Sequence, residues 1–378
     1  MMNQWGKFFR TVEWAPSYFW QKATRRRSTA GRPHLIIGLA DHFEPAIVPG
    51  GSDRADRREQ ERRLKYWCRE YPGVVNEWRD SDGQAFRHTY FYPAEQYDRG
   101  LIERLAEHCH AGWGEIEIHL HHGQNAPDTS ANTRRQIEEF REALVSHGCL
   151  ARANGTGPAR YAFVHGNFAL ANSGRGRFCG VDDEMKVLAE TGCYADFTLP
   201  SAPNVSQTRK INALYECALP LDRAAPHRRG RDLRAGCAPQ VFPLIIQGPL
   251  ALDFGRNGRR WPGIENGEIS GKHSPTMRRL ALWQSAAITV QGRPDWIFVK
   301  LHCHGMDPRD ESAMLGDAMR CFLREVAEEC RAGAIGPVHY VTAREMTNII
   351  LAACDGRSGN PNEYREYRLT PISAPVRV

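Results

Sequence analysis

Histidine side chains recur in this 378-residue chain directly after short apolar runs. Three of them, His119, His121 and His122, lie close together after the alternating segment 115–120. In an extended chain His119 and His121 share one face, and His122 can join them after a turn. Imidazole nitrogens are good ligands for zinc and also suit iron, cobalt and nickel. The spacing therefore predicts a site for a divalent metal, with zinc as the favoured ion.

A carboxylate and an imidazole, Asp41 and His42, end the apolar segment 34–40. A charged group is costly at such a place unless it is paired or bound to a metal. We expect one of the two to bind the metal and the other to act as a general base on a bound water. The alternative is that Asp41 caps the following turn. Glu44 is a further candidate in the same segment.

Two more histidines, His302 and His304, follow the apolar segment 296–301. They are candidate catalytic groups, and general-acid duty, metal ligation and orientation of another ligand are all open to them. Polar side chains after other apolar runs are candidates for binding a substrate. These are Tyr92, His165, Asn167 and Gln247.

Short β-branched or aromatic runs alternate with longer helical patterns along the chain, which predicts a largely parallel sheet. About eight strand–helix steps without a separating linker favour a single-domain, distorted (β/α)7-8 barrel with its active site at the carboxyl ends of the strands. No glycine-rich GxGxxG or GxxxxGK motif follows a predicted strand, which disfavours an open nucleotide-binding sheet. The predicted strands are 34–40, 86–92, 115–120, 160–164, 195–199, 240–247, 296–301 and 338–341, and the predicted helices are 54–69, 94–109, 130–145, 181–190, 274–290, 310–332 and 343–353.

The chain divides into an N-terminal arm, 1–32, a barrel domain, 33–356, and a C-terminal tail, 357–378. Within the domain, residues from about 200 to 237 are rich in proline, arginine and glycine, which predicts an insertion. The arm interleaves several aromatic residues with basic ones. We expect it either to pack on the domain or to contact a membrane surface or a partner.

The composition is that of a globular protein, with 41% hydrophobic and 25% charged residues. No apolar run approaches the ~18 residues of a membrane span. The 11 cysteines form no CxxC pair, so we expect reduced thiols and a cytoplasmic location. A net charge of +6 comes without a nucleic-acid-binding motif, and we expect no nucleic-acid partner.

Three short motifs, Leu39–His42, His119–His122 and Leu301–His304, resemble those of the polysaccharide deacetylase (NodB-type) superfamily. The resemblance covers residues from about 33 to 355 and implies a distorted (β/α)7 barrel. It places Asp41 at the position of the base and His42 at that of a metal ligand. It also implies that His119 and either His121 or His122 bind metal, and that His302 or His304 is the general acid.

These observations favour a metal-dependent hydrolase that acts on a carbohydrate, by N- or O-deacetylation of a sugar or a polysaccharide precursor. One alternative is a glycoside hydrolase on a related barrel, which needs two carboxyl groups across the sugar. The acids available for that chemistry are Asp41 with Glu44 or Asp196. The other alternative is a catalytically silent glycan-binding protein of polysaccharide biosynthesis.

Overall fold

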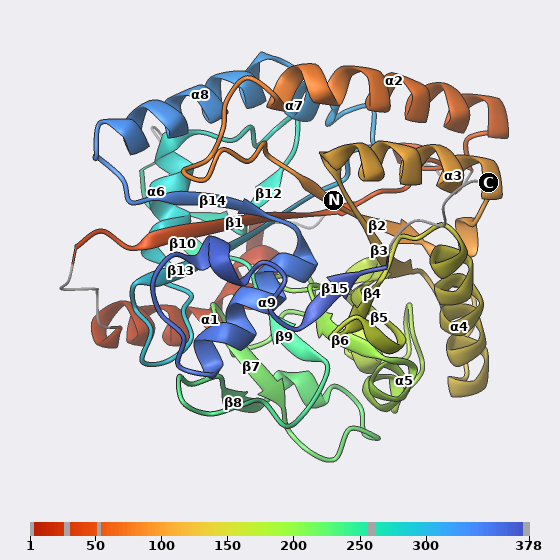
Figure 1. Ribbon diagram of the computed structural model, residues 1–378. Helices are drawn as coiled ribbons and strands as arrows, with labels where there is room; N and C mark the ends of the chain where they lie inside the picture. The colour runs from red at the N-terminus through yellow and green to blue at the C-terminus, as the bar shows by residue number, and fades with distance from the viewer. Residues whose placement is uncertain (1–3, 26–30, 51–53, 256–261, 373–378) are drawn as a thin grey trace.

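A computed structural model describes residues 4–25, 31–50, 54–255 and 262–372 of the chain. Short strands alternate with helices, and every predicted strand and helix overlaps an observed one. The main sheet has 13 strands and is mostly parallel. It curls so that its strands run around a central helix (Figure 1). The parallel strands along its main path are, in spatial order, β12 (Glu268–Ile269), β13 (Trp296–Cys303), β1 (His34–His42), β2 (His88–Pro93), β3 (Gly114–Leu120), β5 (Thr156–His165), β6 (Cys193–Asp196) and β9 (Leu244–Ile246).

The prediction of a (β/α)7-8 barrel is wrong, because the sheet is an open, curled half-barrel. Strand β13 pairs with β1 along residues 34–41. Strand β14 (Val338–Val341) therefore pairs with the opposite edge of β1. On that edge, β14 pairs with residues 35–38 and β2 with residues 39–42. A barrel would need the last strand between β13 and β1. The two-residue β12 and the strands beyond β9 form the ends of the described sheet.

The predicted insertion supplies the strands that extend the sheet beyond β9. Its strand β7 (Leu214–Cys217) pairs antiparallel with β9 and occupies the edge that a barrel would use for closure. Strand β8 (Gly230–Asp232) then pairs antiparallel with β7. Because the insertion saturates the backbone groups of β9, the sheet continues outward instead of closing. The remaining short strands are β4 (Ala151–Ala153), β10 (Ala251–Asp253), β11 (Gly263–Glu265) and β15 (Leu369–Pro371).

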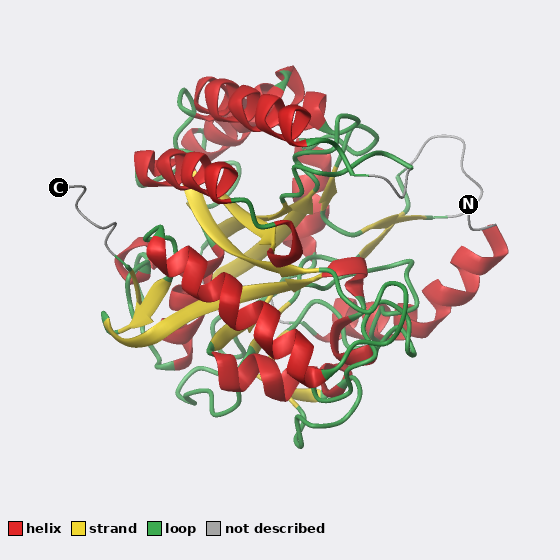
Figure 2. Ribbon diagram, turned by 90° about the vertical axis from the view of Figure 1, so that its right-hand side faces the viewer, coloured by secondary structure: helices red, strands yellow, loops and turns green. Residues whose placement is uncertain are grey.

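Helices cover the convex face of the sheet, and one helix fills its concave face (Figures 1 and 2). That inner helix, α9 (Ala343–Cys354), is buried along its whole length. It starts with a capping box, in which Thr342 accepts from the backbone N–H of Glu345 and Glu345 accepts from that of Thr342. The outer helices are α2 (Arg57–Val75), α3 (Arg99–His108), α4 (Ser130–Ser146), α5 (Glu184–Thr191), α6 (Met277–Ser285), α7 (Glu311–Leu315) and α8 (Asp317–Arg331).

Successive side chains of a strand point to opposite faces of the sheet, and the two apolar cores follow this alternation. Along β1, Leu35, Ile37 and Leu39 pack in the outer core beneath the helices. Ile36 and Ala40 pack in the inner core with α9. The same rule decides on which side of the sheet each histidine at a strand end lies.

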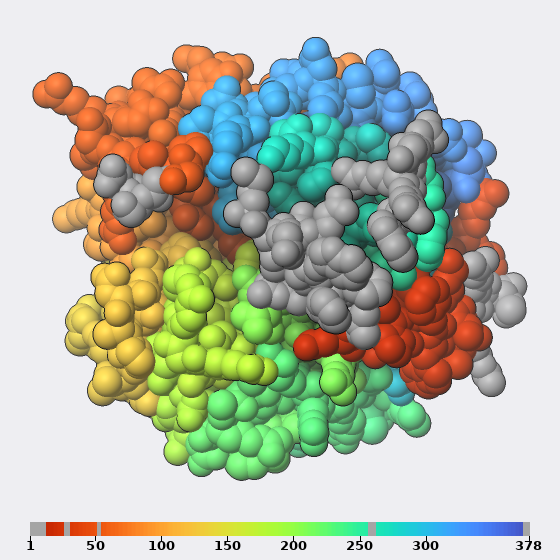
Figure 3. Space-filling model, turned by 180° about the vertical axis from the view of Figure 1, so that it is seen from behind, coloured from red at the N-terminus to blue at the C-terminus, as the bar shows by residue number. Residues whose placement is uncertain are grey.

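The N-terminal arm contains helix α1 (Gln4–Thr24), which lies against the segments around residues 202–252 (Figure 3). Trp14 and Tyr18 are buried there against Ile211 and Leu250. At the other end of the chain, β15 pairs antiparallel with β4, so the predicted tail is part of the fold as far as residue 372. Residues 1–3 and 26–30 of the predicted arm, and 373–378 of the predicted tail, lie outside the described residues.

Candidate metal centre

Five side chains converge at the carboxyl ends of strands β13, β1 and β3, and we call them the inner cluster. The parallel pairing of β1 with β13, and of β2 with β1 and β3, brings these strand ends to one edge. The five residues form two sets of three that share Glu44. Within each set, the possible ligand atoms all lie within 4.8 Å of one another. The members of the inner cluster are His42, Glu44, His119, His121 and His304.

His119 is fully buried and has one ring nitrogen left for a ligand. Its Nδ1 atom lies 2.7 Å from the carbonyl oxygen of Val164, to which it donates as the N–H tautomer. Its Nε2 atom has no hydrogen-bond partner of good geometry among the described residues and lies 3.4 Å from Glu44 Oε1. A histidine whose other nitrogen is bound to a carbonyl is the usual arrangement of a metal ligand.

His121 repeats this arrangement with a carboxylate. Its Nδ1 atom lies 2.8 Å from Glu95 Oε1, and its backbone N–H donates to Glu95 Oε2 at 3.2 Å. Its Nε2 atom lies 3.6 Å from Glu44 Oε1. Glu95 is in the short helix η1 (Ala94–Gln96) that follows β2. Glu95 was not among the residues predicted from the sequence, although its position just after a predicted strand was a usable signal.

Glu44 is the carboxylate that both sets share. Burial alone would raise the pKa of Glu44, but contacts with His119 and His121 outweigh burial and lower the pKa to about 2. Glu44 is therefore ionised, as a metal ligand must be. It was only a secondary candidate in the sequence, because the turn that brings it back toward β3 is not visible there.

His42 and His304 complete the inner cluster from β1 and from the loop after β13. Their ring centroids are 4.8 Å apart, and the centroid of His42 is 5.0 Å from that of His119. His42 is buried, whereas His304 is partly exposed. Rings at such spacings can surround one cation. The cluster therefore offers imidazole and carboxylate donors to an ion, with an accessible histidine at its rim.

His302 lies deeper on the same face, with its ring centroid 6.3 Å from that of His42. Its Nδ1 atom is buried without a hydrogen-bond partner among the described residues. Burial and the positive charge of Lys300 lower the pKa of His302 to about 3. His302 is thus a neutral ring behind the inner cluster.

Asp41 points to the outer face of the sheet, beneath α2. Its Oδ1 atom accepts from the backbone N–H of Gly305 at 2.7 Å, and its Oδ2 atom lies 3.7 Å from His88 Nε2. Burial raises the pKa of Asp41 to about 6, although the Gly305 N–H and Cys303 oppose the shift. Its hydrogen bond holds the loop that carries His304.

His122 and His165 lie together in a second group on the outer face, with Cys179 and Glu184, and we call these four residues the outer cluster. The alternation of the strands separates His122 from His119 and His121, because Leu120 and His122 share the outer side. Cys179 and Glu184 were not among the residues predicted from the sequence, because neither lies next to a histidine in the chain.

The other predicted substrate-binding residues have different surroundings. Asn167 is exposed and precedes Phe168, whose ring centroid is 5.8 Å from that of His42. Tyr92 is buried and donates to the carbonyl oxygen of Gln96 at 3.2 Å. Gln247 is buried and donates to the carbonyl oxygen of Lys210 at 2.9 Å. Of these three residues, Asn167 is the one beside the inner cluster.

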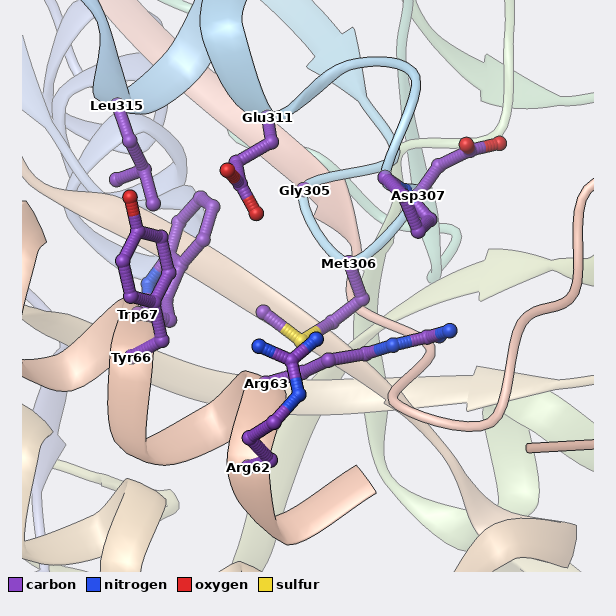
Figure 4. Close-up of a pocket in the computed structure, with 10 residues that line it drawn as sticks. Arg62, Arg63, Tyr66, Trp67, Gly305, Met306, Asp307, Glu311 and Leu315 are labelled. Carbon is purple, nitrogen blue, oxygen red and sulfur yellow. The ribbon is translucent and has the colours of Figure 1, made fainter. Parts of the chain in front are cut away.

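A pocket lies on the outer side of the loop that follows His304 (Figure 4). Met306 and the carboxylate of Glu311 point into it, whereas Asp307 points away. Arg62 and Arg63 of α2 form its lower wall in this view. The residues that line this pocket include no member of the inner cluster, so it is a separate hollow behind the His304 loop.

No protein-family model matches the sequence, and no curated protein sequence matches it either. Among the described residues, no helix is both long and apolar enough to cross a membrane.

Proposed function

We propose that this chain is a metal-dependent hydrolase whose ion is zinc, bound by the inner cluster. The observation that carries the proposal is the paired geometry of His119 and His121. Each ring has its Nδ1 atom bound to an acceptor, and each Nε2 atom faces Glu44 at 3.4 and 3.6 Å. Imidazole and carboxylate donors are those that zinc takes in catalytic sites.

Each residue of the inner cluster has a role in this proposal. His42, Glu44, His119 and His121 hold the ion. A zinc ion there would polarise a substrate carbonyl and lower the pKa of a bound water. His304, at the accessible rim, gives a proton to the leaving group. Asp41, on the outer face, is a positioning residue that holds the His304 loop through Gly305.

The substrate class in this proposal is an N- or O-acyl group on a sugar. The resemblance of the three strand-end motifs to the polysaccharide deacetylases supports it. Asn167 and Phe168, next to His42, offer an amide and an aromatic face, which suit a sugar ring. The exposed position of Asn167 makes it available to a ligand.

A glycoside hydrolase is less well supported by the inner cluster. That chemistry needs two carboxyl groups on opposite sides of the sugar, about 5 to 10 Å apart. Glu44 contacts His119 and His121, and Glu95 is hydrogen-bonded to His121. Asp41 and Asp196 are fully buried. Free acetate as the product supports deacetylation, and a new reducing end supports the glycosidase.

The test measures acetate release from a panel of N- and O-acetylated sugars, with and without a chelator. We expect turnover that the chelator abolishes and zinc restores. A variant with both His119→Ala and His121→Ala should lose turnover, while His110→Ala, a change at an exposed histidine, should retain it. Turnover that survives the chelator and the double substitution would overturn the metal assignment. Glycan binding with neither metal nor turnover would favour the silent binding protein.

A further inference from the structure

The outer cluster lies on the opposite side of the sheet from the inner cluster and has no part in the proposed chemistry. It joins four segments: the turn after β3, the end of β5, the loop before α5, and the first turn of α5. One ligand atom from each of its residues lies within 4.8 Å of the others, and all four residues are buried. Its members are His122, His165, Cys179 and Glu184.

Three possible ligand atoms of the outer cluster lie close to one another. His122 Nε2 lies 2.9 Å from His165 Nε2 and 2.8 Å from Glu184 Oε1. His165 Nε2 lies 3.3 Å from the same oxygen. Nitrogen and oxygen ligands around tetrahedral zinc are about 3.3 Å apart, given bonds of about 2.0 Å. The spacing of these atoms is close to that of a zinc coordination sphere.

The remaining nitrogens of the two imidazoles already have acceptors. His122 Nδ1 lies 2.9 Å from Asp128 Oδ2, and His165 Nδ1 lies 2.5 Å from the carbonyl oxygen of Gly166. When these nitrogens carry the ring protons, both Nε2 atoms present lone pairs to each other and to a carboxylate. Such an arrangement is repulsive unless a metal ion or a second ring proton lies between these atoms.

Glu184 and Cys179 are also arranged as ligands. Glu184 Oε2 accepts from the backbone N–H of Ala171 at 2.6 Å, which leaves Oε1 to face the histidines. Cys179 Sγ accepts from the backbone N–H of Val181 at 3.4 Å. A backbone N–H bond to sulfur stabilises the thiolate, which is the form that binds metal.

We propose that the outer cluster binds a second zinc ion, in a closed structural site with two imidazoles, a thiolate and a carboxylate. Four protein ligands without solvent access are characteristic of structural zinc rather than catalytic zinc. This assignment does not depend on the proposed hydrolase activity.

The loop between His165 and α5 shows why such a site is useful. Six non-glycine residues within residues 167–178 have a positive φ, from 46° to 62°, and the surrounding structure must hold that unfavourable conformation. The apolar core of the loop is small and centres on Ala169, Cys179 and Val181. The same loop carries Phe168 beside His42, so the second ion fixes a wall of the inner cluster from behind.

The test is metal content per chain of the full-length protein, together with the spectrum after exchange into cobalt. We expect two ions per chain in the wild type and one in the His119→Ala, His121→Ala variant. That remaining ion should show cobalt–thiolate charge-transfer absorption. Cys179→Ser should remove this absorption and one ion, whereas Cys193→Ser, at a buried cysteine elsewhere, should keep both.

Two results would overturn the proposal. One is a Cys179→Ser variant with unchanged metal content. The other is a folded His119→Ala, His121→Ala variant that binds no cobalt through sulfur, a measurement that holds even if Cys179→Ser does not fold. Absence of turnover in a wild-type protein that shows the cobalt–thiolate signal would count against the proposed hydrolase and leave the second site standing.

Discussion

The two nitrogens of His121 show how a single side chain is prepared for a ligand. Its Nδ1 atom is bound to Glu95 at 2.8 Å, and the same carboxylate also accepts from the backbone of His121. The ring is therefore fixed in one tautomer and one orientation before an ion arrives. Carboxylates behind metal-bound histidines raise the basicity of the ring and the affinity for the metal.

Glu95→Gln tests this carboxylate. The amide oxygen can still accept the Nδ1–H bond, but the negative charge is lost. We expect zinc affinity at the inner cluster to fall about 10- to 100-fold, as measured by titration against a competing chelator. The matched control is Glu138→Gln, at a carboxylate that is 44% exposed on α4. Equal affinities in both variants would contradict a supporting role for Glu95.

Substitutions of Asp41 distinguish its two possible roles, because a positioning residue and a general base predict different values of kcat. An asparagine side chain at this position can still accept from the N–H of Gly305, so a positioning role predicts that Asp41→Asn keeps kcat within about threefold. Loss of a general base costs roughly 10²- to 10⁴-fold. Under the positioning role, Asp41→Ala should lower kcat more than Asp41→Asn does. A collapse of kcat in Asp41→Asn would restore Asp41 as the base.

Helix α1 was not among the elements predicted for the N-terminal arm, and its buried side chains show how it is held. Two of its tryptophans have opposite surroundings: Trp14 is buried against the domain, whereas Trp20 is 67% exposed. Gln21 donates to the carbonyl oxygen of Ile211 at 2.7 Å and adds a polar contact. Packing on the domain is thus confirmed for the described part of the arm. Contact with a membrane surface or partner, through Phe19 and Trp20, stays a prediction.

Two substitutions in α1 test whether its buried tryptophan, rather than its exposed one, holds the helix on the domain. Trp14→Ala removes a buried ring and should lower the free energy of unfolding by about 3 kcal/mol. It should also open α1 to limited proteolysis. Trp20→Ala should change the free energy by less than about 0.5 kcal/mol. Similar effects of the two substitutions, measured by urea unfolding, would show that α1 is not held through Trp14.

At the scale of the whole molecule, the concave face of the sheet holds buried titratable groups beside α9. Glu117 of β3 points to this face, where its Oε2 atom accepts from the N–H of Ala162 at 2.6 Å and its Oε1 atom from the hydroxyl of Tyr194. Burial raises the pKa of Glu117 to about 8, although these two bonds oppose the shift. The folded protein therefore keeps a proton that the unfolded chain releases above its ordinary pKa of 4.5.

The stability of the fold should depend on this proton. Because the folded state holds the proton more tightly, its contribution is full below about pH 4.5 and is lost as the pH rises through about 8. Relative to Glu117→Gln, the wild type should lose roughly 1.4 kcal/mol per pH unit between those values. Urea unfolding of both proteins from pH 5 to 9 measures the difference. A difference that is independent of pH would show that Glu117 is ionised in the fold.

The sequence by itself determined most of the parallel strands, the helices between them and the strand ends that carry histidine, but not helix α1 or strands β7 and β8. These features follow from local patterns, since apolar periodicity sets an element and a polar residue directly after an apolar run marks the end of a strand. Only the tertiary structure decided that the sheet stays open, because β14 pairs with the far edge of β1 and β7 occupies the edge of β9.

The same division holds for the candidate sites. Glu44 joins the inner cluster through a turn, and Glu95 supports His121 of that cluster from the helix after β2. Cys179 and Glu184 join the outer cluster from a distant loop and from the start of α5. Such contacts depend on which strands are neighbours and on which face the helices cover, and neither is encoded in the spacing of residues along one strand. The sequence could therefore name most of the histidines, but the fold sorted them into two clusters and supplied their carboxylates and thiol.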